Sequence, residues 1–95
     1  MIRHIVLMKL REGASSERNG QLIKEGLKGL VGVVNGLVAT EVLLGFSKNY
    51  DVCVISDFDS HESVAAYGPH PDHQKMREFI HKVVEDNRPA FDCEI

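Results

Sequence analysis

The sequence has no tryptophan, only two cysteines and no long hydrophobic run. No stretch approaches the ~20 apolar residues of a membrane-spanning helix, so we expect no membrane partner. The 11 Lys and Arg residues are scattered and outnumbered by 14 Asp and Glu, which argues against a nucleic-acid partner because that affinity needs clustered positive charge. Few cysteines, and an N-terminus without a signal-peptide pattern, lead us to expect a cytoplasmic protein with free thiols.

What remains is the composition of an ordinary globular domain of 95 residues, 43% hydrophobic and 26% charged. A chain this short buries only about 60% of the surface that its unfolded form exposes, so it folds with little margin. No linker, repeat or low-complexity tract interrupts the sequence. We therefore treat residues 1–95 as a single domain.

Apolar alternation and helical periodicity predict four strands and two main helices. The expected order is a strand over 2–10, a polar turn over 11–14, a helix from Ser15 or Ser16 to the Asn35-Gly36 pair, strands over 37–46 and 50–58, a short helix from a capping box at Asp59 and Glu62 to about Tyr67, a helix from Pro71 to 87–89, and a strand over 91–95. This β-α-β-β-α-β order is typical of the ferredoxin-like α+β fold, an antiparallel sheet with helices on one face.

The predicted strands carry apolar residues on both faces, and two helices can cover only one of them. A second copy of the chain is the simplest cover for the other face, so we expect a homodimer joined sheet to sheet. We place the even-numbered face of the first strand, with Val6, in the interior of this dimer. Asp92 is expected to line the same interior.

Two of the five histidines fall on apolar faces. His4 alternates with Ile2 and Val6, which fits either a hydrogen-bonded core histidine or an acid–base group in a pocket. His73 follows Pro71 and shares a helical face with Ile80. There the helix dipole disfavours its charged form, so it is either a neutral base or a capping and packing residue.

Tyr67 and Asp92 complete the candidate set. Tyr67 is either an amphipathic plug or a phenol that donates a hydrogen bond to a substrate oxygen. Asp92 is either a rim carboxylate or the partner of a histidine. His70 and His73 have the spacing of two metal ligands, but no third ligand is in register, so we expect no metal and no other cofactor. The two cysteines, Cys53 and Cys93, fall on strands separated by the first strand and are not expected to pair.

Four segments resemble one family: the opening residues 2–7, the strand-to-helix junction 57–63, the Tyr-x-x-His-Pro-x-His segment 67–73 and the closing Ala-Phe-Asp 90–92. They are similar to the stress-responsive dimeric α/β-barrel (Dabb) domain family over essentially the whole chain. The resemblance implies a homodimer whose two four-stranded sheets form a barrel.

The family includes a plant polyketide cyclase that closes a linear polyketide by aldol condensation. This sequence matches the site of that enzyme at His4, Tyr67, His73 and Asp92, and the resemblance implies that His73 and Tyr67 are the main catalytic groups. The plant enzyme has bulky apolar residues where Gly68 and Pro69 stand here, so the resemblance extends to the pocket and not to the substrate.

Two functions follow. The first is a cofactor-free acid–base enzyme, such as an aldol-type cyclase, isomerase or lyase acting on a small carbonyl compound, with His73 as base, Tyr67 as oxyanion donor, and His4 and Asp92 as orienting groups. The alternative is a non-catalytic, stress-related or ligand-binding oligomer. A barrel interior that contains a pocket of a few hundred Å³ with His73 and Tyr67 exposed to it would favour catalysis or binding.

Overall fold

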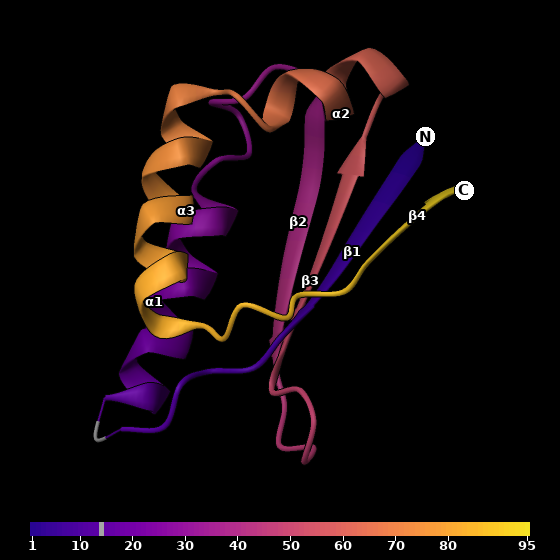
Figure 1. Ribbon diagram of the computed structural model, residues 1–95. Helices are drawn as coiled ribbons and strands as arrows, with labels where there is room; N and C mark the ends of the chain where they lie inside the picture. Colours follow the sequence, from indigo (N-terminus) through magenta and orange to yellow (C-terminus); the bar gives the residue numbers. More distant parts are fainter. Residues whose placement is uncertain (14) are drawn as a thin grey trace.

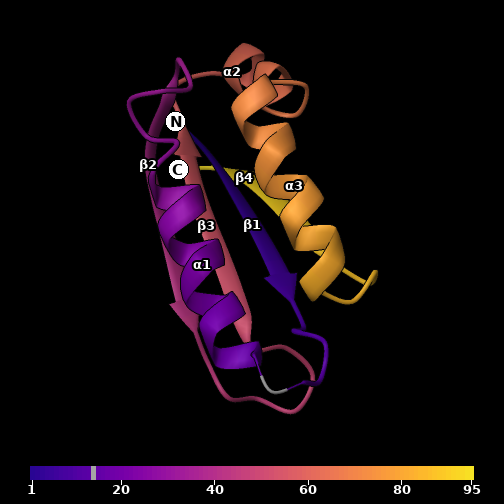
Figure 2. The ribbon, with the colours of Figure 1, turned by 90° about the vertical axis from the view of Figure 1, so that its left-hand side faces the viewer.

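The computed structural model describes residues 1–13 and 15–95, so the final residue of the turn expected over 11–14 lies outside the described residues. The elements are β1 (Ile2–Met8), α1 (Ser16–Lys28), β2 (Leu37–Leu44), β3 (Val52–Phe58), α2 (His61–Tyr67), α3 (Pro71–Val83) and β4 (Ala90–Glu94). The strands form one antiparallel sheet in the order β2-β3-β1-β4. α1 and α3 lie on one face of the sheet, and α2 lies at one end (Figures 1 and 2). The expected ferredoxin-like α+β fold is confirmed.

The strand register decides which side chains share a face. β1 pairs with β3 so that Val6 lies opposite Val54, and with β4 so that His4 lies opposite Asp92. Directly opposed residues point to the same side of a sheet. Burial alternates along β3, where Val54 and Phe58 are buried and Ile55 is half-buried, because only one face meets the helices.

Val6 and the other even-numbered residues of β1 face the helices. Val6 packs against the buried core, so its assignment to the dimer interior is wrong, and Asp92 shares this helix-covered face. The opposite side of the sheet, which we call the open face, carries Ile5, Leu7, Leu43, Cys53, Ile55, Phe91 and Cys93. Alternation alone did not separate the two faces of β1, because both are apolar.

α1 ends earlier than its apolar pattern predicted. The helix stops at Lys28, with Gly29 as its C-cap, and turns connect it to β2. Glycine costs roughly 1 kcal/mol relative to alanine inside a helix, and Gly32 and Gly36 adopt φ of 89° and 86°, outside the helical region. Val34, expected in the helix, is instead buried in the connection.

The start of α2 and the end of α3 also differ from the prediction. Ser60, rather than Asp59, is the N-cap of α2, and its hydroxyl accepts a hydrogen bond from the Ser63 backbone N–H. α3 ends at Val83 because Val84 turns extended and forms a β-bridge with Leu10. The chain therefore leaves the helix several residues before 87–89, and these residues border the site described below.

The two cysteines are free and half-buried, and β1 lies between their strands as expected. Within the described residues, no helix is long and apolar enough to cross a bilayer.

Candidate functional site

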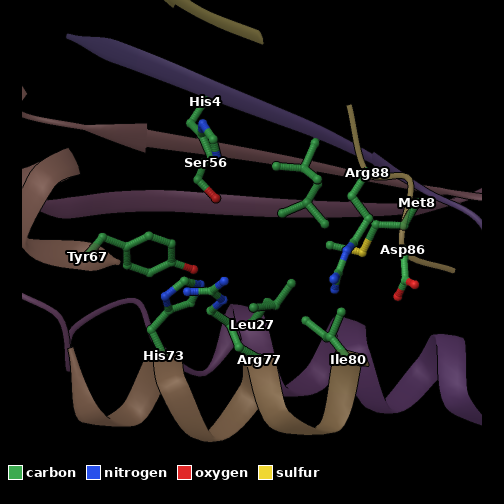
Figure 3. Close-up of a pocket in the computed structure, with 12 residues that line it drawn as sticks. His4, Met8, Leu27, Ser56, Tyr67, His73, Arg77, Ile80, Asp86 and Arg88 are labelled. Atoms are coloured by element: carbon green, nitrogen blue, oxygen red, sulfur yellow. The ribbon is translucent and has the colours of Figure 1, made fainter. Parts of the chain in front are cut away.

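A cavity of about 370 Å³ lies between the helix-covered face of the sheet and α3 (Figure 3). Its apolar lining consists of Val6, Met8, Leu27, Val54 and Ile80, and its polar lining consists of His4, Ser56, Tyr67, His73, Arg77, Asp86 and Arg88. The cavity is therefore lined by elements of one chain. His4, Tyr67 and His73 meet on the helix-covered side of the sheet, without a contribution from a second copy.

Tyr67 and His73 enter the cavity from the two sides of the break between α2 and α3. Tyr67 is the last residue of α2, and His73 lies in the first turn of α3. Their rings are stacked, with centroids 3.9 Å apart and planes inclined by 25°. The other edge of the tyrosine is fixed by Phe58, whose ring centroid is 5.1 Å away in an edge-to-face arrangement. The pair is therefore positioned by the core.

The break itself is built by Pro71 and His70. Pro71 occupies the first turn of α3, where a missing N–H leaves no helical bond unmade. The Nδ1 atom of His70 accepts a hydrogen bond of 3.2 Å from the Asp72 backbone N–H. The capping role considered for His73 thus belongs to His70, which leaves the His73 ring in the cavity.

Burial sets the protonation states of this pair. It raises the pKa of Tyr67 to about 12, so the phenol keeps its proton at neutral pH. Burial also lowers the pKa of His73; the Gly68 carbonyl opposes this shift, and the positive charge of Arg77 reinforces it. At neutral pH the site therefore holds a neutral imidazole next to a phenolic hydrogen-bond donor.

The Gly68 carbonyl also selects the tautomer of His73. The Nδ1 atom lies 3.3 Å from Gly68 O. Because a carbonyl oxygen only accepts hydrogen bonds, Nδ1 must carry the proton and Nε2 the lone pair of the neutral ring. Gln74 fixes the same carbonyl by donating a hydrogen bond of 2.7 Å to it. Such a ring is equipped to accept a proton through Nε2.

The sheet contributes His4, Asp92 and Ser56. His4 lines the cavity, and its Nδ1 is hydrogen-bonded to the Asp92 carboxylate on the neighbouring strand. Asp92 does not line the cavity, and 57% of its side chain is exposed. Three of the four expected site residues therefore meet at the cavity, and the fourth contacts it through His4.

Sequence reasoning missed the polar residues Ser56, Arg77, Asp86 and Arg88. A signal existed for two of them. Ser56 interrupts the buried apolar face of β3, and Arg77 follows His73 by four residues, which places both on one helical face. Asp86 and Arg88 lie in the irregular connection before β4, where periodicity gives no information. Among the described residues, no group of three or more His, Cys, Asp or Glu side chains could hold a metal ion.

The fold and site define a class of ferredoxin-like α+β protein with a cavity beneath its helices. The model of the stress responsive A/B barrel domain matches residues 2–95. The chain belongs to this family, as its sequence motifs indicated. None of the curated proteins matches the sequence.

Solved structures agree over the full length. A dimeric ferredoxin-like protein of unknown function from Bacteroides fragilis is 25% identical, with a TM-score of 0.87 over 99% of this chain and 95% of that one. A similar dimeric protein from Thermobifida fusca is also 25% identical, with a TM-score of 0.71 over 99% and 90%. A Dabb family protein from Mesorhizobium loti, 22% identical, has a TM-score of 0.78 over 99% and 95%.

Proposed function

We propose that this protein is a homodimeric, cofactor-independent acid–base enzyme that removes a proton from the carbon next to the carbonyl group of a small substrate. One observation carries the proposal: the His73 imidazole, whose Nδ1 contacts the Gly68 carbonyl, is stacked on the Tyr67 phenol ring, and both side chains line one cavity. A general base works best when its own proton is absent at the working pH. An oxyanion donor must keep its proton, as Tyr67 does.

The proposed step transfers one proton. The Nε2 lone pair of His73 takes the α-proton, the electrons of the C–H bond form a C=C bond, and the π electrons of the C=O bond move to the carbonyl oxygen to form an enolate. The Tyr67 hydroxyl stabilises that oxygen by donating a hydrogen bond. The enolate then attacks a second carbonyl carbon, expels a leaving group or takes back a proton, which gives an aldol-type cyclase, a lyase or an isomerase respectively. His4, held by Asp92, orients the substrate from the sheet side.

The homodimer is supported by the open face. In the single chain, this face exposes 63% of Phe91 and 47% of Leu43, and no helix formed by residues 1–13 or 15–95 covers it. The related structures from Bacteroides fragilis and Thermobifida fusca are described as dimeric. A second copy packed on the open face would bury these side chains and leave the cavity on the helix side.

The reaction can be tested by deuterium exchange, without knowing the natural substrate. We would incubate 1-phenylpropan-2-one, a neutral ketone with activated α-protons, with the protein in deuterated buffer and follow the loss of the α-proton signal by NMR. The His73→Ala variant should lose about 100-fold or more of the protein-dependent rate. Tyr67→Phe keeps the ring stack and removes only the donor, and it should lose about 10- to 100-fold.

His61→Ala is the matched control, because His61 lies on α2 with 79% of its side chain exposed and does not line the cavity. Its exchange rate should equal that of the wild type. If the wild type accelerates exchange no more than His73→Ala does, the enzyme proposal is wrong. Saturable binding of the ketone without exchange would instead support the non-catalytic ligand-binding function.

A further inference from the structure

Arg77 places a positive charge at the reacting end of the cavity. It lies on α3, four residues after His73, and its guanidinium extends toward the Tyr67 and His73 side chains (Figure 3). Among the described residues, no carboxylate forms an ion pair with it. The proposed mechanism does not use this side chain.

The other charged groups at the cavity, and Asp92 beside it, have hydrogen-bond or ion-pair partners within the chain. Arg88, at the far end of the cavity from Tyr67, donates a hydrogen bond of 2.8 Å to Nδ1 of His81, which occupies its fork without neutralising its charge. Asp86 forms an ion pair with Arg11 at 3.3 Å. Asp92 is paired with His4. Arg77 is exposed to solvent and, within the described part of the chain, forms no ion pair, so its guanidinium is free to bind an anion beside the two groups to which we assign the chemistry.

We propose that the substrate is a carbonyl acid whose carboxylate binds Arg77. The inference rests on the proposed function, because it assigns the ligand of the same cavity. A guanidinium is a planar fork of donors that matches a carboxylate with two parallel hydrogen bonds. Bound in this way, the carboxylate would hold the neighbouring carbonyl beside Tyr67 and His73.

The apolar lining of the cavity suits an apolar substituent on such an acid. Leu27 of α1, Val54 of β3 and Ile80 of α3 line it from three elements. Leu27, Val54 and Ile80 are each at most 5% exposed, so this lining is part of the packed core. The ligand we infer is therefore amphipathic, with a carboxylate next to the reactive carbonyl and a hydrocarbon or aryl group at the other end.

Carboxylate binding would also change the base. Burial is the largest cause that lowers the pKa of His73, and the positive charge of Arg77 adds to it. The other polar groups facing the ring are Tyr67 of α2, the Gly68 carbonyl and His4 of β1. A carboxylate paired with Arg77 offsets that positive charge, so the pKa of His73 should rise when the acid binds and the imidazole should become a stronger base.

The test compares phenylpyruvate with 1-phenylpropan-2-one, in which a methyl group replaces the carboxylate. Each probe is titrated into ¹⁵N-labelled protein at neutral pH, and Kd is taken from backbone amide shifts. The wild type should bind the acid about tenfold or more tightly than the ketone, as expected for a hydrogen-bonded ion pair. Arg77→Gln should abolish this preference, and Arg77→Lys should retain part of it, because a lysine keeps the charge without the fork.

Lys75→Gln is the matched control on the same helix, since Lys75 is 79% exposed and does not line the cavity. It should keep the wild-type preference. Equal affinity of the wild type for both probes, no saturable binding of the acid, or a preference that survives Arg77→Gln would each overturn the inference. A preference lost in Arg88→Gln but kept in Arg77→Gln would overturn it as well, by moving the carboxylate to the other end.

The result is separable from the proposed function. His73→Ala should keep the preference for the acid while losing deuterium exchange. If exchange is absent from the wild type but the preference depends on Arg77, the cavity binds carbonyl acids and the catalytic proposal alone fails.

Discussion

Replacing Phe91 with serine should dissociate the proposed dimer while each protomer stays folded. Phe91 lies on β4 at the edge of the sheet, and 63% of its surface is exposed in the single chain. Its cross-strand partner is Ile5 on β1, so it stands on the open face. A partner packed against this face would remove most of the remaining surface of the ring from water.

The size of the effect follows from area. A phenylalanine ring buries about 200 Å², so covering the exposed part of Phe91 removes about 125 Å² of apolar surface, or about 3 kcal/mol at 25 cal/mol per Å². In a two-fold symmetric dimer the substitution occurs twice, which gives about 6 kcal/mol. Since 1.4 kcal/mol corresponds to a tenfold change, Kd should rise by about four orders of magnitude.

Sedimentation velocity across a wide range of micromolar concentrations measures the change directly. The wild type should sediment as a dimer and Phe91→Ser as a monomer with unchanged far-ultraviolet circular dichroism. Val33→Ser is the control, because Val33 is 53% exposed but lies in the connection between α1 and β2. A Phe91→Ser protein that remains dimeric at the lowest concentration would refute the placement of the interface on the open face.

Two further predictions concern stability. Gly36→Ala should destabilise the protein by about 1–2 kcal/mol because of its positive φ, and by more because the new Cβ would clash with the Ser63 side chain. Gly32→Ala should show only the effect of its positive φ, because no described atom lies within 4 Å of the added Cβ. Urea unfolding of both variants measures the difference, and equal losses of stability would contradict the clash. The pKa of Tyr67 is raised to about 12 in the folded state and is about 10 in the unfolded chain. The contribution of the buried neutral phenol to the free energy of folding is therefore fully present below pH 10 and is lost as the pH rises toward 12, by up to about 2.7 kcal/mol. Tyr67→Phe should remove this part of the alkaline loss of stability, and an unchanged pH profile would show that the phenol is not buried in solution.

Apolar segments of strand length were sufficient to predict the sheet. Only β3 alternates regularly between buried and half-buried residues, and the single-sheet topology follows from the order of the elements. The ends of the helices were less predictable. Val84 continues the apolar periodicity of α3 but leaves the helix to form a β-bridge with Leu10. These two residues are far apart in the sequence and meet only in the folded chain.

The two faces of β1 illustrate a different limit. Val6 and Met8 on one side, and Ile5 and Leu7 on the other, are equally apolar, so hydrophobicity cannot assign either side to the helices. The register decides it, because Val6 lies opposite Val54 beneath the helices. The sequence thus predicted that both faces of the sheet would be buried, but not which face packs against the helices and which against a second copy of the chain.

Some residues of the candidate site could also be predicted from the sequence, and others could not. Tyr67 and His73 could be singled out because they flank a proline-containing break, and local sequence fixes the geometry there. The contact between His4 and Asp92 joins residues 88 positions apart and depends on the pairing of β1 with β4. The charge of Arg77 gains a meaning only once the cavity is known, because a solvent-exposed arginine on a helix is otherwise unremarkable in a sequence.

We expect the open face and the cavity to be coupled through β4. This strand pairs with the sheet on one side only, and it carries Phe91 on the open face next to Asp92 on the cavity side. An edge strand held by a single ladder frays more easily than one held also by a packed partner, so covering Phe91 should order the backbone that presents Asp92 to His4.

Monomeric Phe91→Ser should therefore lose part of the orienting effect of Asp92 and show slower deuterium exchange, although His73, Tyr67 and the helices are untouched. Asp92→Asn should slow exchange in the dimer but add little to Phe91→Ser; if the two effects multiply instead, the dimer supports the site by some other route.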